Sequence, residues 1–219
     1  MKIKEILEYL RKFEEEGKRI FISSSFQTHS IPLLHILKES GVNFDVLFIN
    51  TGFHFPETLA FRTKISRLLK LNLINVTPII PKKLQLDSEG HFYFVSDPNY
   101  CCDINKTEPM ESYLKEYDIW INGVRKDQSK FRQNLDLFED TQFKAKRFHP
   151  ILDWNDQMTD DYRRQYNLPE HPLDSQGFKS IGCEPCTLKD LGEGSRDSRW
   201  KGMNKTECGL HTNLIIKEK

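Results

Sequence analysis

The sequence has no long apolar run and no excess of charge of either sign. No stretch approaches the roughly 20 apolar residues that a helix needs to cross a bilayer. The 32 basic and 32 acidic residues cancel, so no global field attracts the chain to nucleic acid or to a membrane. The amino-terminal residues MKIKE lack the apolar segment of a signal peptide. Cysteine is scarce and odd in number, five in all, which favours a cytoplasmic protein with reduced thiols.

Length and composition indicate a globular chain. At 219 residues, with 37% hydrophobic and 29% charged residues, it can form one large domain or a domain with an appendage. Periodic patterns end near Asp174, and the remainder is rich in Gly, Cys and Arg. We therefore expect a nucleotide-binding domain over residues 1–174 and a C-terminal segment over residues 175–219.

The periodic part alternates helices and strands. Helical spacing of apolar residues predicts helices over 3–13, over 28–40 and from Pro56 onward. Apolar runs predict strands at 19–22, 44–49, 73–77 and 117–121, a weaker one at 148–152, and a hairpin over 84–95. This alternation indicates an α/β fold with a mostly parallel, twisted sheet and helices on both faces.

Four of the five cysteines form two tight pairs, Cys101–Cys102 and Cys183–Cys186. A tetrahedral zinc site prefers ligands about two to four residues apart. Adjacent cysteines splay apart and suit different iron atoms of one four-iron cluster, which is also held by four thiolates. The adjacent pair therefore favours an iron–sulfur cluster, while a structural zinc site and two oxidised pairs remain alternatives. The fifth, Cys208, stands alone near the C-terminus and can act as a nucleophile.

Two polar loops follow predicted strands, at the edge where parallel sheets bind ligands. Ser23, Ser24 and Ser25 follow the first strand, so that hydroxyls and free backbone N–H groups can face a phosphate. Thr51 and Gly52 follow the second strand. A plain N-cap for the serines and a plain turn for the second loop are the alternatives.

Seven segments, from about residue 20 to residue 211, carry a resemblance to a known family: SSSFQ, NTGFHFPET, CCDINKTEP, WINGVRKDQSKFR, SIGCEPCT, RDSRW and ECGLH. In these motifs the chain resembles the assimilatory adenylylsulfate (APS)/phosphoadenylylsulfate (PAPS) reductases of the iron–sulfur-cluster type. The resemblance implies an adenine nucleotide α-hydrolase-like fold and thioredoxin, or glutaredoxin, as electron donor. It also implies a homodimer or homotetramer. Members that carry both cysteine pairs bind a [4Fe-4S] cluster and usually reduce APS, and members without them use PAPS.

The resemblance also implies residue roles. Cys208 would attack the sulfate sulfur, release AMP and leave an S-sulfocysteine from which thioredoxin frees sulfite. The cluster ligands would be Cys101, Cys102, Cys183 and Cys186. The substrate-binding residues would be Ser23, Ser24, Ser25, Thr51, Gly52, Lys106, Arg125, Arg132, Arg196, Arg199 and His211. Chemistry supports the cations, because a nucleophile reaches a sulfate sulfur only when its negative oxygens are neutralised. We expect the same cations to hold Cys208 as a thiolate.

Several residues depart from the family pattern or have no assigned role. Asn50 stands where the family usually has Asp, and Asn105 replaces an Arg, which removes one positive charge. APS or PAPS, or both, therefore remain possible substrates. The histidines other than His211 do not group at metal-ligand spacing and indicate surface or core positions: His29, His35, His54, His91, His149 and His171. Trp200 is expected either to pack beneath Arg199 or to serve the core.

Two other classes of protein are alternatives. A nucleotide-activating sulfur transferase acting on RNA shares the expected fold, but it would show an SGGxDS-type loop and a basic surface, whereas this chain has SSSFQ and zero net charge. A non-catalytic module stapled by zinc would be colourless, whereas an iron–sulfur protein is brown.

Overall fold

The computed structural model describes residues 1–190, 198–203, 205, 207–212 and 214. The helices are α1 (Ile3–Glu15), α2 (Ile31–Glu39), α3 (Pro56–Leu68), α4 (Tyr93–Ser96), α5 (Pro98–Cys102), α6 (Glu108–Glu116), α7 (Asp156–Gln165) and α8 (Gly209–Thr212). The strands are β1 (Ile20–Ser23), β2 (Asp45–Ile49), β3 (Leu73–Val76), β4 (Ile119–Ile121), β5 (Phe138–Glu139) and β6 (Lys146–Phe148).

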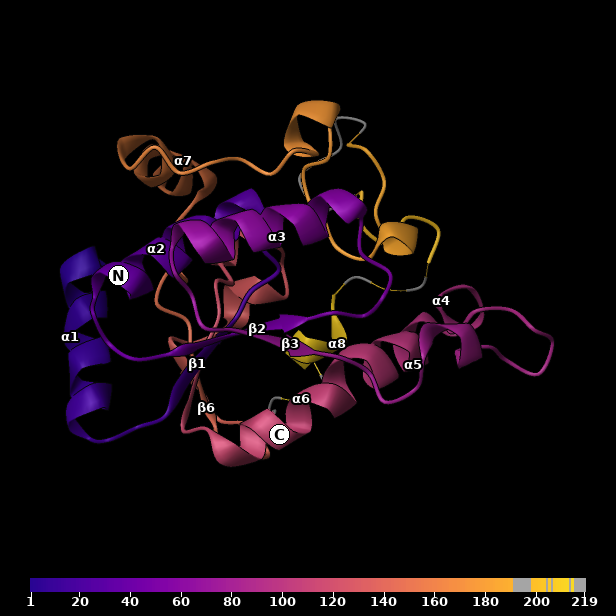
Figure 1. The fold of residues 1–219 in the computed structure, drawn as a ribbon, viewed down its shortest axis with the longest axis horizontal. Helices are drawn as coiled ribbons and strands as arrows, with labels where there is room; N and C mark the ends of the chain where they lie inside the picture. The colour runs from indigo at the N-terminus through magenta and orange to yellow at the C-terminus, as the bar shows by residue number, and fades with distance from the viewer. Residues whose placement is uncertain (191–197, 204, 206, 213, 215–219) are drawn as a thin grey trace.

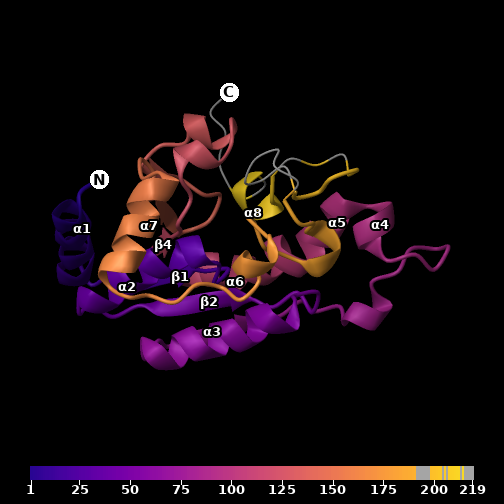
Figure 2. The same cartoon turned by 90° about the horizontal axis from the view of Figure 1, so that it is seen from above.

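The strands form one sheet in the order β3-β2-β1-β4-β6-β5. All neighbours pair in parallel except β5 and β6, which are antiparallel. Figures 1 and 2 show α2 and α3 on one face of the sheet and α5, α6 and α8 on the other. The order reverses at β1, which lies between β2 and β4, so the carboxyl ends of these strands form the crevice where such sheets bind ligands.

Each face of the sheet has its own apolar cluster. The larger cluster joins α1, α2, α3 and α7 to the sheet, and the smaller one joins α6 to the face that carries Phe21 and Trp120. Leu214, from the C-terminal segment, is fully buried in this smaller cluster. Leu214 therefore packs against the same face of the sheet as α6.

Most predicted elements are confirmed, with two differences, and helices α5 to α8 and strand β5 have no counterpart among the predicted elements. The predicted hairpin over residues 84–95 is reduced to one antiparallel bridge, between Leu86 and Phe92, and the chain then turns into α4. The last predicted strand lies earlier than expected, at β6, because Phe148 ends its pairing with β4. The two-residue strand β5 is too short to leave a sequence pattern.

A continuous helical segment from α5 to α6 carries the first cysteine pair. Asp97 caps its start by accepting hydrogen bonds from the backbone N–H groups of Asn99 and Tyr100, at 3.1 and 3.0 Å. Between α5 and α6 the helix widens into a π-helical turn, Asp103–Thr107, a distortion that often marks functional sites. Cys101 and Cys102 stand immediately before this turn. Among the described residues, none of the helices is both long and apolar enough to cross a membrane.

Candidate active site

A cavity opens at the carboxyl ends of β1, β2 and β4, as the sheet topology predicts. It brings together the serine loop, the end of β2, the segment after β4 and parts of the C-terminal segment. The predicted site residues that line it are Ser23, Ser24, Ser25, Lys106, Arg125, Arg132, Cys183, Arg199 and Cys208. Residues more than 180 positions apart in the sequence therefore share one cavity.

The serine loop is not a simple helix cap. A short 3-10 turn, Thr28–Ser30, separates it from α2, and Ser30 caps α2 with no side-chain hydrogen bond. Phe26 is fully buried and holds a left-handed backbone with φ of 53°, a conformation that is costly for a bulky residue. The Ser24 hydroxyl accepts from the N–H of Phe26 at 3.1 Å and holds this bend. The bend keeps the serines at the cavity wall.

The four paired cysteines converge on one place. Cys101 and Cys102 come from α5, whereas Cys183 pairs with His54 in a short β-bridge and a 3-10 turn, Glu184–Cys186, follows it. Each pair lies within electrostatic range of the other. Among the described residues, no three His, Cys, Asp or Glu side chains are close enough to hold a single metal ion. Four thiols from two segments of the chain are the donor set that a four-iron cluster uses.

Three side chains direct hydrogen-bonding groups at these sulfurs. The Thr51 hydroxyl lies 3.3 Å from Sγ of Cys183. The Nδ2 of Asn105 lies 3.6 Å from Sγ of Cys101, and the Nζ of Lys106 lies 3.7 Å from Sγ of Cys102. Hydrogen bonds to the ligand sulfurs are among the features that tune iron–sulfur sites.

Asn105 belongs to a buried amide pair with Gln85. Asn105 donates to Oε1 of Gln85 at 2.6 Å, and Gln85 donates back to Oδ1 of Asn105 at 3.0 Å. Gln85 also donates to the carbonyl of Ile80 at 2.8 Å, and Asn105 donates to the carbonyl of Cys101 at 2.9 Å. Both side chains are almost fully buried. The amide thus fills a place that an arginine could occupy only with a further anionic partner.

Burial and mutual charge control the thiols. Burial and the neighbouring Cys102 charge raise the pKa of Cys101 to about 12. Burial also raises the pKa of Cys186. Burial opposes the charge on Lys106, but the nearby sulfurs of Cys102, Cys183 and Cys208 outweigh it and raise the Lys106 pKa. Lys106 is therefore a permanent cation among the cysteines.

Cys208 lies beside Cys102. The two side chains share a hydrogen bond, which raises the pKa of Cys208 and lowers that of Cys102 to about 4. Lys106 and Lys205 both favour the negative charge on Cys102. Lys106 favours the negative charge on Cys208 too, which is the direction expected for a thiolate nucleophile, and the hydrogen bond with Cys102 opposes it.

Glu207 ties Cys208 to the cavity wall. Its carboxylate accepts from Nε and Nη2 of Arg132 at 2.9 and 3.0 Å, and both side chains are buried. The same carboxylate accepts from the backbone N–H of Cys208 at 3.0 Å. Arg132, for which the resemblance implies an anion contact, thus binds a carboxylate of the protein itself.

The two other cavity arginines, Arg125 and Arg199, differ in the partners that their guanidinium groups contact. Arg125 is buried and pairs with Asp127, at 3.1 Å, and with Asp156, and its Nη1 has no partner among the described residues. Arg199 donates to the carbonyl of Cys186 at 3.0 Å. Its guanidinium stacks on Trp200 at 4.5 Å, as expected.

Some predicted residues lie elsewhere. Thr51 and Gly52 do not line the cavity; Thr51 instead contacts a cysteine sulfur. Arg196 lies outside the described residues, and His211 lies in α8, where its side chain is not described. Sequence reasoning missed Asn122, Lys205 and the role of Glu207. Their only sequence signal was that they stand beside or within the quoted motifs.

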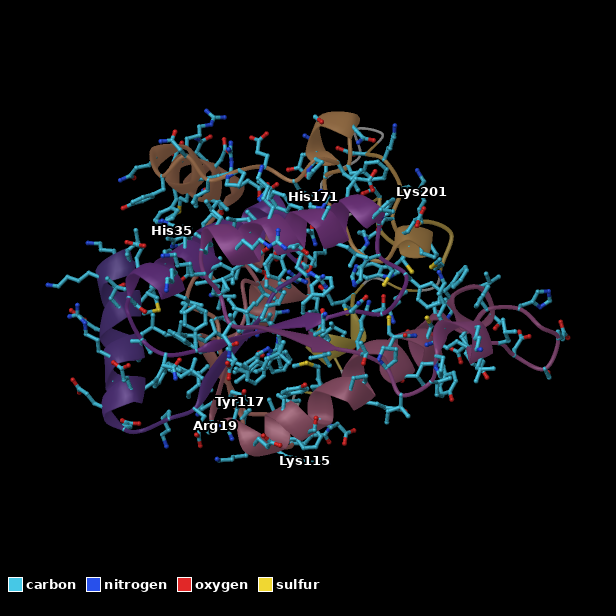
Figure 3. The ribbon with its side chains drawn as sticks, viewed as in Figure 1. Arg19, His35, Lys115, Tyr117, His171 and Lys201 are labelled. Carbon is cyan, nitrogen blue, oxygen red and sulfur yellow. The ribbon has the colours of Figure 1, made fainter. Side chains whose placement is uncertain are left out.

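The described histidines lie at core, surface and cavity positions, and His91 is the exposed one. In Figure 3, His35 and His171 lie on the face of the sheet that α2 and α3 cover. His35 contacts the Tyr162 hydroxyl at 2.9 Å, and His171 contacts the Thr58 hydroxyl at 3.1 Å. His29 and His54 line the cavity instead, and burial lowers the pKa of His54 to about 4. No histidine signal in the sequence separated these two groups.

Comparison with known proteins agrees with this geometry. Residues 19–189 match the family described as phosphoadenosine phosphosulfate reductase domain. The chain is 36% identical to the adenosine 5'-phosphosulfate reductase of Bacillus cereus (strain Q1), over 91% of this chain and 86% of that protein. It is also 36% identical to the enzyme of the same name from Rhodococcus erythropolis, over 83% of this chain and 74% of that protein.

Solved structures support the fold. The phosphoadenylyl-sulfate reductase of Candida auris superposes with a TM-score of 0.71 at 21% identity, covering 83% of this chain and 89% of that one. The FMN adenylyltransferase of Candida glabrata, bound to FMN and an ATP analogue, gives a TM-score of 0.59 at 18% identity, covering 92% and 80%. The expected adenine nucleotide α-hydrolase-like fold is confirmed.

Proposed function

Because the chain belongs to the phosphoadenosine phosphosulfate reductase family, we propose that it reduces APS to sulfite and AMP in sulfate assimilation. One observation carries the proposal. Cys208, Lys106, Arg199 and the serine loop line a single cavity at the carboxyl edge of the sheet. A lone thiol, cations and a nucleotide-binding loop together are what attack on an activated sulfate requires.

The reaction proceeds in two displacements. The Cys208 thiolate attacks the sulfate sulfur, a sulfur–sulfur bond forms, and the bond to the phosphate oxygen breaks, so that AMP leaves with the electron pair. A thiolate of a dithiol donor such as thioredoxin then attacks Sγ of Cys208 and sulfite leaves with the electron pair. The second thiol of the donor resolves the mixed disulfide, and Cys208 is regenerated while the donor becomes a disulfide.

Before the first displacement Cys208 must lose its proton. Lys106 favours the charge on Cys208 as well as on Cys102, and it is also suited to neutralise the sulfate oxygens. Arg199 also lines the cavity, and in the described contacts its guanidinium meets the Cys186 carbonyl and the Trp200 ring rather than a carboxylate. We assign these two residues to the phosphosulfate, and Arg132 to holding the catalytic segment through Glu207.

A [4Fe-4S] cluster fits the cysteines, and its ligands would be Cys101, Cys102, Cys183 and Cys186. The support is an all-thiol donor set that converges from two segments, with hydrogen-bonding groups aimed at three of the sulfurs. When bound, the cluster would supply fixed charge beside the substrate rather than electrons. We assign the second ligand pair and the nucleophile to a C-terminal segment over residues 175–219. We also place the protein in the cytoplasm, because the mechanism requires reduced thiols.

Sulfite release under anaerobic conditions tests the proposal. With thioredoxin and APS, the wild-type protein is expected to release sulfite and Cys208→Ser is expected to release none. Incubation with APS alone should make Cys208 heavier by one SO3 group. Equal rates for the two proteins would dispose of the covalent mechanism, and faster turnover of PAPS would make PAPS the substrate.

Lys106 provides a second test. Lys106→Ala should lose turnover while its iron and sulfide content stay unchanged, because the ammonium acts on the substrate and not as a ligand. Lys115→Ala is the matched control, since Lys115 lies on the outer side of α6 in an exposed pair with Glu111, as Figure 3 shows. A Lys106→Ala protein with an intact cluster and full turnover would exclude this role.

A further inference from the structure

Asn122 is a buried amide at the cavity wall, and its side chain has no hydrogen-bond partner in the part of the chain that the structure describes. It follows β4 directly, and its backbone N–H donates to the carbonyl of Phe148 at 3.2 Å. The residue is 3% exposed, and neither Nδ2 nor Oδ1 has a hydrogen-bond partner among the described residues. The residue lines the same cavity as Ser23 and Cys208.

Such an amide is unfavourable in the free protein. Burial removes both a donor and an acceptor from water, and no described group replaces the lost hydrogen bonds. Its three predecessors in β4 are all buried apolar residues, so an apolar side chain would suit the position better. A buried polar side chain without hydrogen bonds at a cavity wall therefore indicates that the residue binds a ligand.

The position of Asn122 limits what it can meet. In the parallel register, Ile22 of β1 stands beside Ile121 of β4, so Asn122 follows in line with Ser23. The Trp120 ring nitrogen donates to the Ser23 hydroxyl at 2.8 Å. Residues two apart in a strand point to the same face, so Asn122 lies on the face that also carries Trp120. Asn122 is thus next to the serine loop.

The chemistry of the amide then selects the ligand group. Phosphate and sulfate oxygens only accept hydrogen bonds, so they would leave Oδ1 unpaired. A group that both donates and accepts satisfies both amide atoms. In an adenine nucleotide such groups are the ribose hydroxyls and the adenine edge, where an amino group stands beside a ring nitrogen.

We propose that Asn122 binds the nucleoside part of the substrate through both of its amide atoms, an inference that rests on the proposed function. Asn122 is thus a binding residue, and it holds the nucleoside while Lys106 and Arg199 meet the anionic end. The shared chemistry is a paired donor and acceptor, which either the ribose or the base can supply.

Calorimetric binding of AMP and of adenosine tests the proposal in wild type, Asn122→Leu and Asn122→Asp, with melting temperatures measured without nucleotide. We expect Asn122→Leu to melt no lower than wild type and yet to bind both compounds about tenfold or more weakly. Asn122→Asp keeps an acceptor, loses the donor and should be weakened as well. Asn43→Leu, an exposed asparagine at the opposite end of the sheet, should bind both normally.

Each outcome has a defined meaning. Normal binding by Asn122→Leu, or a loss seen with AMP but not with adenosine, would overturn the inference, since the latter indicates a phosphate contact. If wild type itself binds neither compound, the proposed function fails first. Should Asn122→Leu not fold, normal adenosine binding by Asn122→Asp would count against the proposal. IMP and the 2′- and 3′-deoxy forms of AMP then distinguish the base from the ribose. An analogue that lacks the group bound by Asn122 should bind wild type more weakly than AMP does. The same analogue and AMP should bind the Asn122 variant equally.

Discussion

Replacing Glu207 by Gln tests whether the Arg132–Glu207 ion pair holds the catalytic cysteine in place. The substitution keeps the shape of the side chain and one acceptor oxygen, and it removes the charge. In the structure Glu207 accepts two hydrogen bonds from Arg132 and one from the backbone of Cys208. All three weaken or disappear in the variant, and the Arg132 charge loses its buried partner.

The magnitude follows from burial. The two side chains are only 6% and 3% exposed, so solvent screens the pair little. Removing one partner of a buried ion pair costs about 3–5 kcal/mol. Because Gln retains part of the hydrogen bonding, we expect the docking of the C-terminal segment to weaken by about 2–3 kcal/mol. That loss corresponds to a roughly 30- to 160-fold smaller docking constant.

Alkylation of Cys208 reports docking directly. With iodoacetamide and peptide mass analysis, Cys208 should react faster in Glu207→Gln than in wild type, and kcat/KM should fall. Glu116→Gln is the matched control, because Glu116 pairs with Arg19 at 3.7 Å on the surface, with both side chains more than half exposed, where such pairs contribute little. If Glu207→Gln leaves both the alkylation rate and kcat/KM unchanged within twofold, the ion pair does not position Cys208.

Three further predictions concern the surroundings of the site. Asn105→Leu removes the N–H group aimed at Cys101, so the reconstituted cluster should show a shifted reduction potential by electron paramagnetic resonance, whereas an unchanged potential would leave the amide a purely structural role. Gly182→Ala should lower kcat/KM and keep the fold, because a Cβ there would meet the Arg199 guanidinium at 2.3–2.5 Å and displace it; full activity would mean that Arg199 is not needed where it lies. Burial lowers the pKa of His171 to about 4, so the unfolded chain binds a proton at this residue first as the pH falls below about 6.5. The free energy of unfolding should therefore drop by about 2 kcal/mol by pH 5 from this residue alone. His171→Leu should lessen this pH dependence in chemical denaturation, and an unaltered pH dependence would contradict the assignment.

Local pattern was enough to predict most of the fold. Helix α1 and strands β1 to β4 follow from apolar spacing, because each element buries a face that its own sequence defines. The hairpin expected over residues 84–95 is shorter than predicted: Asp87 holds its turn, with hydrogen bonds from Glu89 and His91, but the chain from Tyr93 onward forms α4 instead of a second strand. A turn signal alone cannot tell which partner the following residues will take.

The sequence by itself determined the chemical inventory of the protein: two thiol pairs, a lone C-terminal thiol, a serine loop after a strand, and the order of the elements. Tertiary structure decided which of these groups meet. Glu207 reaches Arg132, 75 residues away, and Gln85 reaches Asn105 across a loop, because side-chain pairing depends on how distant elements pack and not on local spacing. The contact between Cys102 and Cys208, and the amide of Asn122 that has no hydrogen-bond partner among the described residues, arise because folding removes these groups from water and brings distant segments together.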